Sequence, residues 1–211
     1  MDHIHSVEVL LDGRAISIDR PTLAEALRAG VAAAQQQSRI VIEVKGDGRR
    51  IPDDLLAQPS DELTTIRVIE LVSANPRELA AKSLRDAAAA IDELRETQQA
   101  AASAMHAGEA AFDELGTIFS SWQAVRGVVQ QAGAVLGVDV MNIPLKIDDS
   151  QDTVAAATAD LSTHLRAMKD AMGAQDISAM ADVLAYDLDA AAERWARVLL
   201  ALAGALGGTT P

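Results

Sequence analysis

The sequence contains no cysteine, and it is poor in aromatic residues, with two Trp, two Phe and one Tyr. The absence of cysteine excludes disulfides, thiolate zinc sites, thiol nucleophiles and cysteine-ligated clusters. So few aromatic side chains leave no stacking platform for nucleic-acid bases. Several large classes of enzyme and of nucleic-acid-binding protein are therefore excluded or disfavoured.

Basic residues are also scarce, since 18 Lys and Arg stand against 31 Asp and Glu, which gives a formal net charge of −13. Binding to nucleic acid or to an anionic membrane draws on clustered positive charge. We therefore expect neither partner for this chain.

Long hydrophobic runs are missing as well. The longest, Val198 to Leu206, has nine residues, far fewer than the roughly 20 that cross a bilayer as a helix. The first residues, Met1-Asp2-His3, lack the basic region and the apolar run of a secretory signal. These features predict a cytoplasmic protein with no membrane span.

The first third of the chain has the pattern of a small mixed α/β domain, which we place at residues 1–73. Apolar and polar residues alternate on both sides of Asp12-Gly13, which predicts a β-hairpin. The capping box Thr22-Leu23-Ala24-Glu25 then predicts a helix over about 23–37. Two further β-branched runs, 40–44 and 64–72, predict strands.

This order of elements resembles the β-grasp fold of the ubiquitin-like superfamily. The segments that carry the resemblance are VEVLLDGRAISI, TLAEALRAGVAAA, IVIEVKGDGRRIPDDLL and TTIRVIELV. The resemblance implies one helix lying across a sheet, with Ile40, Ile42, Ile66 and Val68 pointing into the core.

On the opposite face of that sheet the same resemblance places Leu10, Val41 and Ile69, an apolar patch of the kind through which ubiquitin-like domains are often bound. We include Arg67 in this candidate partner surface. The alternative is that the patch packs on the rest of the chain.

The remaining two thirds predict an antiparallel bundle of four helices over residues 75–205. Asn75-Pro76 marks the junction, because Asn can cap a helix and Pro fits its first turn. Apolar residues recur at steps of three and four in four stretches, so each forms one stripe of a helix. The stripes are Leu84, Ala87, Ile91, Leu94, Gln98, Ala101, Met105; Phe112, Leu115, Phe119, Trp122, Arg126, Val129, Gly133, Leu136; Val154, Thr158, Leu161, Leu165, Met168, Met172; and Ile177, Met180, Leu184, Leu188, Ala191, Trp195, Val198, with Ala201 or Leu202.

Two features of the helical part leave alternatives open. Arg126 interrupts a stripe, where it either pairs with a carboxylate, lies at the edge while Val125 takes the core position, or binds an anion. The connection 138–149 is long and apolar, so it either caps the bundle or binds something. Gly207-Gly208 ends the last helix, and residues 206–211 are expected to form a flexible tail.

No catalytic or metal-binding constellation stands out. Di-iron bundles need Glu-x-x-His pairs, and zinc-protease, calcium-loop and Gly-x-Ser-x-Gly motifs are absent. His3 and His5 share a strand face but supply only two ligands. We expect no enzyme activity, no metal site and no cofactor.

The last helical segment, DISAMADVLAYDLDAAAERWARVLLAL, places Tyr186 and Trp195 nine residues apart, on opposite sides of a helix. Asp182, Tyr186-Asp187-Leu188 and Trp195 resemble the terminal helices of small helical proteins from flagellated bacteria, including export chaperones. The chain departs from those chaperones in carrying an additional α/β domain.

Together these patterns predict an α+β protein, a small β-grasp-like domain followed by an antiparallel four-helix bundle. We expect a noncatalytic protein–protein interaction module in the bacterial cytoplasm, an adaptor, assembly factor or chaperone that binds another protein or a second copy of itself. The candidate partner-binding residues are Leu10, Val41, Arg67, Ile69, Tyr186 and Trp195. The alternative is a small-molecule sensor whose pocket lies near Trp122, Arg126 and the 138–149 connection.

Overall fold

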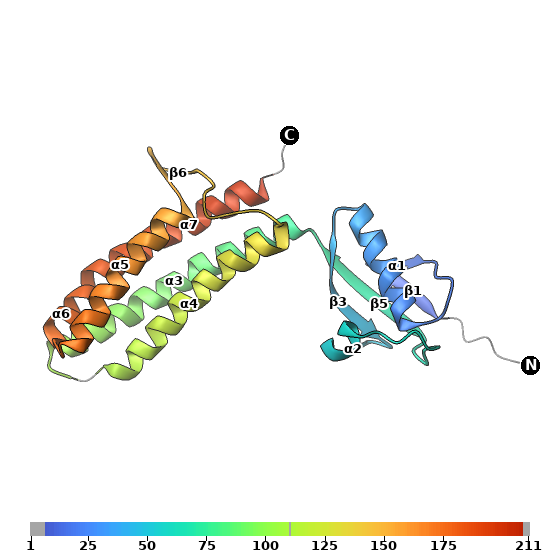
Figure 1. Ribbon diagram of the computed structural model, residues 1–211, viewed down its shortest axis with the longest axis horizontal. Coiled ribbons are helices and arrows are strands. Elements are labelled where there is room, and N and C mark those ends of the chain that lie inside the picture. Colours follow the sequence, from blue (N-terminus) through green and yellow to red (C-terminus); the bar gives the residue numbers. More distant parts are fainter. Residues whose placement is uncertain (1–6, 110, 209–211) are drawn as a thin grey trace, which may run out of the picture. The chain divides into compact units, whose positions relative to one another are not determined.

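The computed structural model describes residues 7–109 and 111–208. The chain divides into two compact units, Met1–Pro76 and Arg77–Pro211, which we call the sheet unit and the helical unit (Figure 1). The predicted α+β class is confirmed, because a five-stranded sheet occurs together with several helices. His3 and His5 lie outside the described residues.

The sheet unit is built on a mixed sheet with the strand order β2-β1-β5-β3-β4. The two central strands β1 and β5 are parallel, and the other neighbours are antiparallel. Because β5 comes last in the chain and lies in the middle, it joins the two hairpins. The strands are β1 (Glu8–Leu11), β2 (Arg14–Ile16), β3 (Ile40–Gly46), β4 (Arg49–Arg50) and β5 (Val68–Ala74).

Both hairpins turn on an Asp-Gly pair, as Asp12-Gly13 predicted for the first. Asp12 and Asp47 have φ values of 49°, and Gly13 and Gly48 have 78° and 77°, the left-handed geometry that favours Asp-Gly in two-residue hairpin turns. Each aspartate also holds an end of β5. The Asp12 carboxylate accepts hydrogen bonds from the amide (2.8 Å) and hydroxyl (2.6 Å) of Ser73.

At the opposite end of β5, Asp47 has the same role. Its carboxylate accepts from the amides of Arg67 and Val68, both at 3.0 Å.

At the first turn, the hydrogen bonds from Ser73 hold the pKa of Asp12 below its usual range.

One face of the sheet is covered by α1 (Leu23–Gln36), which begins at the expected cap, where the Thr22 hydroxyl accepts from the Glu25 amide at 3.1 Å. Gly30 lets this helix approach β5, because a β-carbon there would overlap the side chain of Leu71. A short helix, α2 (Asp53–Ala57), follows β4. The core between α1 and the sheet is made of Val9, Leu11, Leu23, Ala26, Ala34, Val44, Ile51, Ile69 and Leu71.

The predicted outer patch of the sheet is wrong for two of its residues. Ile69 is fully buried under α1, because the parallel register pairs it with buried Val9. Val41 also packs against this core, since a bulge between Val41 and Glu43 shifts the alternation along β3. The bulge leaves Ile42 49% exposed.

Of the four residues expected in this core, only Ile66 packs on it. Ile40 and Val68 are half-buried and Ile42 is exposed. The assignment failed because the face of a strand depends on its register, and one bulge reverses it.

The helical unit contains α3 (Pro76–His106), α4 (Phe112–Leu136), α5 (Val154–Gly173), α6 (Ile177–Asp182) and α7 (Leu188–Gly207). A π-helical turn, η1 (Val183–Asp187), joins α6 to α7. The predicted set of four continuous helices is therefore not what the structure has, since the last stretch is divided. Within 138–149 and just beyond it lies a small hairpin of β6 (Leu145–Ile147) and β7 (Ser150–Asp152).

Most residues of the predicted stripes are buried, and five are half-buried: Phe119, Leu136, Thr158, Leu165 and Ala201. Phe112 is 60% exposed, and Arg126 is exposed while Val125 takes the core position. Met172 and Ile177 lie at the surface, 40% and 45% exposed. The predicted tail at 206–211 begins too early, because α7 continues to Gly207 and Leu206 is buried; residues 209–211 are outside the described part.

At the centre of this core, Trp122 of α4 and Trp195 of α7 pack edge to face, with ring centroids 6.2 Å apart. The Trp195 indole N–H donates to the carbonyl of Ala157 on α5 at 3.2 Å. Gln98 of α3 is also fully buried, and neither its amide N nor its O has a hydrogen-bond partner in the described ranges. The indole N–H of Trp122 lacks one as well.

We expect Gln98→Met to raise the free energy of unfolding by about 1–2 kcal/mol, because an unsatisfied buried amide carries a desolvation penalty of about 1–3 kcal/mol. Urea unfolding monitored by tryptophan fluorescence would measure this change, with the denaturant slope unchanged. The neighbouring Gln99→Met is the control. Gln99 donates to the Ala185 carbonyl at 3.0 Å, so its loss should lower stability. A destabilised Gln98→Met variant would contradict the prediction.

Candidate functional site

A cluster of charged side chains in the helical unit surrounds Arg194 of α7. Its guanidinium binds the carboxylate of Asp152 through two hydrogen bonds of 2.8 Å and lies 3.2 Å from Asp160 of α5. His164, one turn further along α5, lies 3.5 Å from Asp160 and 3.9 Å from Asp187 of η1. Four elements, β7, α5, η1 and α7, therefore meet at one network of charges.

The hairpin β6–β7 brings Asp152 to this position. The turn between its strands contains Asp148, with φ of 53°, and the Ser150 hydroxyl donates to the Ile147 carbonyl at 3.0 Å. Asp152 also accepts from the Thr153 amide at 2.8 Å, and Thr153 caps α5 by accepting from Ala156. The end of the hairpin and the start of α5 thus fix one carboxylate.

The electrostatics of the network follow from this geometry. The two hydrogen bonds from Arg194 hold the pKa of Asp152 below its usual range, although burial opposes the shift. The same bonds raise the pKa of Arg194. Both groups are therefore charged over the physiological range, and they act as a fixed ion pair.

A hollow of about 550 Å³ lies over this network. Arg197 is also at its wall, 52% exposed and 3.6 Å from Asp148. The donors of Arg194 are already occupied by carboxylates, and no group of His, Asp and Glu side chains within the described residues could hold a metal ion. Chemically the hollow is a polar surface with a preformed ion-pair network.

A second polar seam joins α3 to the other helices. Arg95 binds Asp189 of α7 through two hydrogen bonds of 2.9 and 3.0 Å, which lower the pKa of Asp189 and raise that of Arg95. Gln99 donates to the Ala185 carbonyl within η1, and His106 lies 3.3 Å from Asp182. This seam supplies a side-chain partner for backbone inside the π-helical turn, where the α-helical ladder is interrupted.

A third feature is a shallow groove between α3 and α4, which we call the α3/α4 groove. It consists of two hollows of about 310 and 150 Å³ that share Val128 in their walls. Glu93 is its single charged wall residue. Apart from Gln131 of α4, the other wall residues are small or apolar: Leu79, Ala80, Ser83, Ala87, Ala90, Leu94 and Thr97 from α3, and Thr117, Ser121, Ala124, Val125, Val128, Ala132 and Val135 from α4.

The residues predicted to bind a partner do not form one surface. In the sheet unit, Leu10 is half-buried and Arg67 is exposed. In the helical unit, Tyr186 of η1 is 69% exposed while Trp195 is 1% exposed. The expectation that these two lie on opposite sides is confirmed, and the assignment of Trp195 to a binding surface is wrong because its ring and its N–H are both used inside the core.

The structure does not bring Trp122 and Arg126 together at one exposed site. Trp122 is buried against Trp195, and Arg126 is exposed on α4. The 138–149 connection contributes Ile147 and Asp148 to the hollow over Arg194 instead.

The sequence predicted neither the hollow over Arg194 nor the position of the α3/α4 groove, although Ala-rich stripes are expected to leave shallow grooves between helices. Asp152 and Arg194 are 42 residues apart, and no spacing rule links them. A signal for the groove was present in the Ala, Ser and Thr residues beside the predicted stripes of α3 and α4, because small side chains next to a seam leave space between helices.

Comparisons of the chain with protein-family models, curated proteins and solved structures found no match. None of the helices in the described ranges combines the length and the apolar character needed to span a bilayer.

We expect Asp152→Asn to lower the free energy of unfolding at pH 7 by about 1–3 kcal/mol, the range for hydrogen bonds to charged groups. Because folding lowers the pKa of Asp152, its contribution is fully present above the unfolded value of about 3.9 and is lost as the pH falls through the folded value. The wild type should therefore lose more stability than the variant between about pH 5 and pH 2.

Urea unfolding across this pH range would measure both effects. Asp148→Asn is the matched control, because Asp148 is 79% exposed and its ion pair should contribute less than about 1 kcal/mol. Equal losses in the two variants would contradict the role given to Asp152.

Proposed function

We propose that this chain is a noncatalytic protein–protein interaction module, an adaptor, assembly factor or chaperone of the bacterial cytoplasm that holds a helical segment of another protein. The observation that carries the proposal is the α3/α4 groove. Its walls combine aliphatic side chains with small Ser and Thr residues and Gln131, and Glu93 is their single charge. Such walls suit the apolar face of a partner helix.

The dimensions of the groove support this occupant. Its walls extend from Leu79 to Thr97 on α3 and from Thr117 to Val135 on α4, which is about 27 Å at 1.5 Å per residue. A partner helix of about 18 residues would fill that length. Val135 is 37% exposed, so apolar surface remains for such a helix to cover.

We also propose finer assignments for the two units. The strand order β2-β1-β5-β3-β4, with parallel central strands and α1 across one face, supports a β-grasp domain. For the helical unit, α3, α4, α5 and α7 contribute to a single core, which supports a four-helix bundle whose last helix is interrupted by η1. The internal pairing of the Arg194 network supports a structural role for those charges over a catalytic one.

The variant Ala90→Glu with Ala124→Glu tests the groove, because both positions are exposed walls and the change adds bulk and charge. Its control is Ala89→Glu with Ala134→Glu, two exposed positions outside the walls with the same change in charge. We expect affinity capture from the lysate of the native host to recover a stoichiometric partner with the wild type and the control, and to lose at least about 90% of it with the groove variant.

Mass spectrometry of the captured protein would identify the partner, and light scattering would give the mass of the purified chain. Equal capture by the groove and control variants would contradict the proposal. A dimer that the groove variant dissociates would assign the groove to a second copy of this chain.

The hollow over Arg194 favours a second candidate, a sensor of small polar molecules. Its volume of about 550 Å³ lies within the range of about 300–1,000 Å³ found for ligand pockets. A ligand should raise the Tm of the wild type in a thermal-shift screen and raise it less in Arg197→Ala, which loses an exposed wall cation. If no polar metabolite raises the Tm of the wild type, the result contradicts the sensor and leaves the interaction module as the proposed function.

A further inference from the structure

Several positively charged side chains of the helical unit form no ion pair within the described residues, and three of them lie on α4 and α5. Arg126 is the single cation of α4, and Arg166 and Lys169 are the two cations of α5. All three are exposed, and none forms an ion pair within residues 7–109 and 111–208. By contrast, Lys82, Arg95 and Arg194 of the same unit are paired.

The helical periodicity places these cations away from the α3/α4 groove and from the hollow over Arg194. Residues two apart on a helix are about 200° apart, so Arg126 lies opposite the groove residue Ala124. On α5, Asp160 and His164 face α7 and η1 through Arg194 and Asp187, whereas Arg166 and Lys169 are turned about 120° or more from Asp160.

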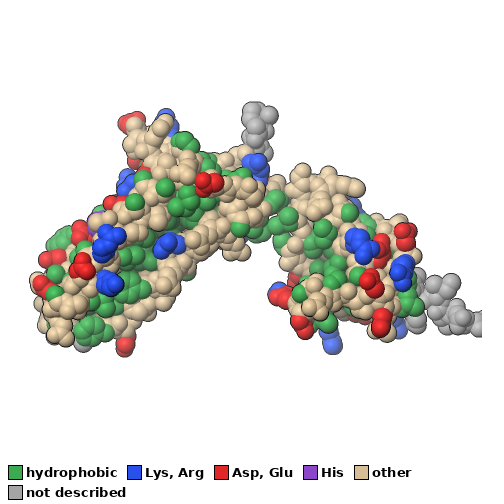
Figure 2. Space-filling view, viewed as in Figure 1, with side chains coloured by type: hydrophobic (Ala, Val, Ile, Leu, Met, Phe, Trp, Pro, Cys, Tyr) green, Lys and Arg blue, Asp and Glu red, His purple; other side chains and the backbone are tan. Residues whose placement is uncertain are grey.

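The arrangement of the helices brings Arg126 of α4 to the same side of the unit as the two cations of α5. The groove makes α3 and α4 neighbours, the Arg95–Asp189 pair joins α3 to α7, and the Arg194–Asp160 contact joins α7 to α5. With one core shared by these four helices, the pair that closes the ring is α4 and α5. In Figure 2, several Lys and Arg side chains lie on the visible face of the helical unit, with Asp and Glu side chains among them.

Few carboxylates lie near this face. The two acidic residues of α4, Asp113 and Glu114, lie in its first turn beside Phe112 and are turned about 120° or more from Arg126. Of the two carboxylates in the body of α5, Asp160 is engaged by Arg194 and His164, which leaves Asp170. In a chain with a net charge of −13, this is a local excess of positive charge.

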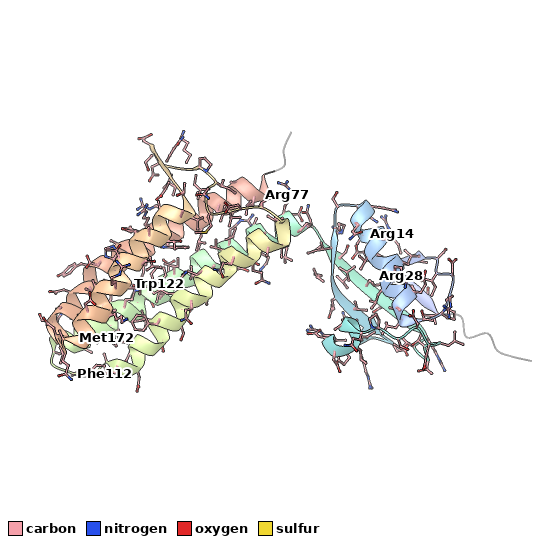
Figure 3. All side chains as sticks on the ribbon, in the orientation of Figure 1. Arg14, Arg28, Arg77, Phe112, Trp122 and Met172 are labelled. Atoms are coloured by element: carbon pink, nitrogen blue, oxygen red, sulfur yellow. The ribbon has the colours of Figure 1, made fainter. Side chains whose placement is uncertain are left out.

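Apolar surface adjoins the cations at one end. Phe112 at the start of α4 is 60% exposed, and Met172 near the end of α5 is 40% exposed; Figure 3 places both at the same end of the helical unit. Met172 follows Lys169 by three residues, so the two lie on one side of α5. Ile177, 45% exposed, and Phe112 also line a small pocket of about 110 Å³.

We propose that this face, defined by Arg126, Arg166, Lys169, Phe112 and Met172, binds an acidic amphipathic segment of a partner protein. The apolar side chains of the segment cover Phe112 and Met172, and its carboxylates pair with the three cations. A nucleic acid or an anionic membrane would meet the repulsion of the whole acidic chain, whereas a short segment meets only this local field. The face is separate from the α3/α4 groove, so the two proposals stand or fall independently.

The test uses the full chain and a fluorescein-labelled synthetic peptide of about 18 residues, with Leu along one helical face and Glu elsewhere. We expect a saturable change in anisotropy that weakens as salt is added. A peptide of the same composition in scrambled order should bind at least about tenfold more weakly, because it presents no apolar face.

The charge-reversed variant Arg126→Glu, Arg166→Glu, Lys169→Glu should lose at least about tenfold in affinity. The control variant Arg20→Glu, Arg49→Glu, Lys146→Glu makes the same change in net charge at exposed positions elsewhere and should stay within about twofold. Replacing the three cations by Gln gives a milder variant that should lose part of the affinity if the charge-reversed chain does not fold. The groove variant Ala90→Glu with Ala124→Glu should bind the peptide as the wild type does.

Several results would overturn the proposal. They are no binding of the peptide at about 1 mM, equal binding of the scrambled peptide, or equal losses in the charge-reversed and control variants. Binding of single-stranded DNA or of phosphatidylserine vesicles in place of the peptide would reassign the face, and a dimer that the charge-reversed variant dissociates would assign it to a second copy.

Discussion

The arrangement of the helical unit depends on the buried indole of Trp195. Its ring packs against Trp122 of α4, and its N–H is bonded to the Ala157 carbonyl of α5. One side chain of α7 therefore fixes two other helices by shape and by a directed hydrogen bond. The ion pairs of Arg194 and Arg95 then join α7 to α5 and to α3 at the rim. With α7 set in this way, the space left between α3 and α4 becomes the groove, and the outer sides of α4 and α5 remain free.

The helix α7 follows directly after η1, where the regular α-helical hydrogen bonds are interrupted. The π-helical turn η1 offsets the residues after it relative to those before it, which places Asp187 beside His164 while Leu184 and Leu188 stay in the core. Gln99 compensates by donating to a carbonyl within the turn. The two neighbouring amides of α3 therefore differ in hydrogen bonding. The Gln99 amide has a partner in η1, whereas the Gln98 amide is buried with none in the described ranges.

Periodicity predicted the buried stripes well where a helix is long and regular, as for Leu84 to Met105 in α3. It failed at helix ends such as Phe112, the first residue of α4, which is 60% exposed. In the sheet unit the Asp12-Gly13 turn and the Thr22 cap were readable because they are local. The inward face of β3 was not, because the bulge at Ile42 depends on pairing with β5. The hollow over Arg194 and the face that contains Arg126, Arg166 and Lys169 depend on residues from distant elements, which no single stretch of sequence reveals.

The position of β5 has a consequence for how the sheet unit is made. β5 is the last strand of this unit to be synthesised, yet it lies between β1 and β3. Hydrogen bonds to the carboxylates of Asp12 and Asp47 hold its two ends. Until residues 68–74 leave the ribosome, the two hairpins have no strand to join them, and the carboxylates of both turns have no amides from β5 to bind. Through most of the synthesis of this unit, the nascent chain therefore has two hairpins that no central strand yet joins.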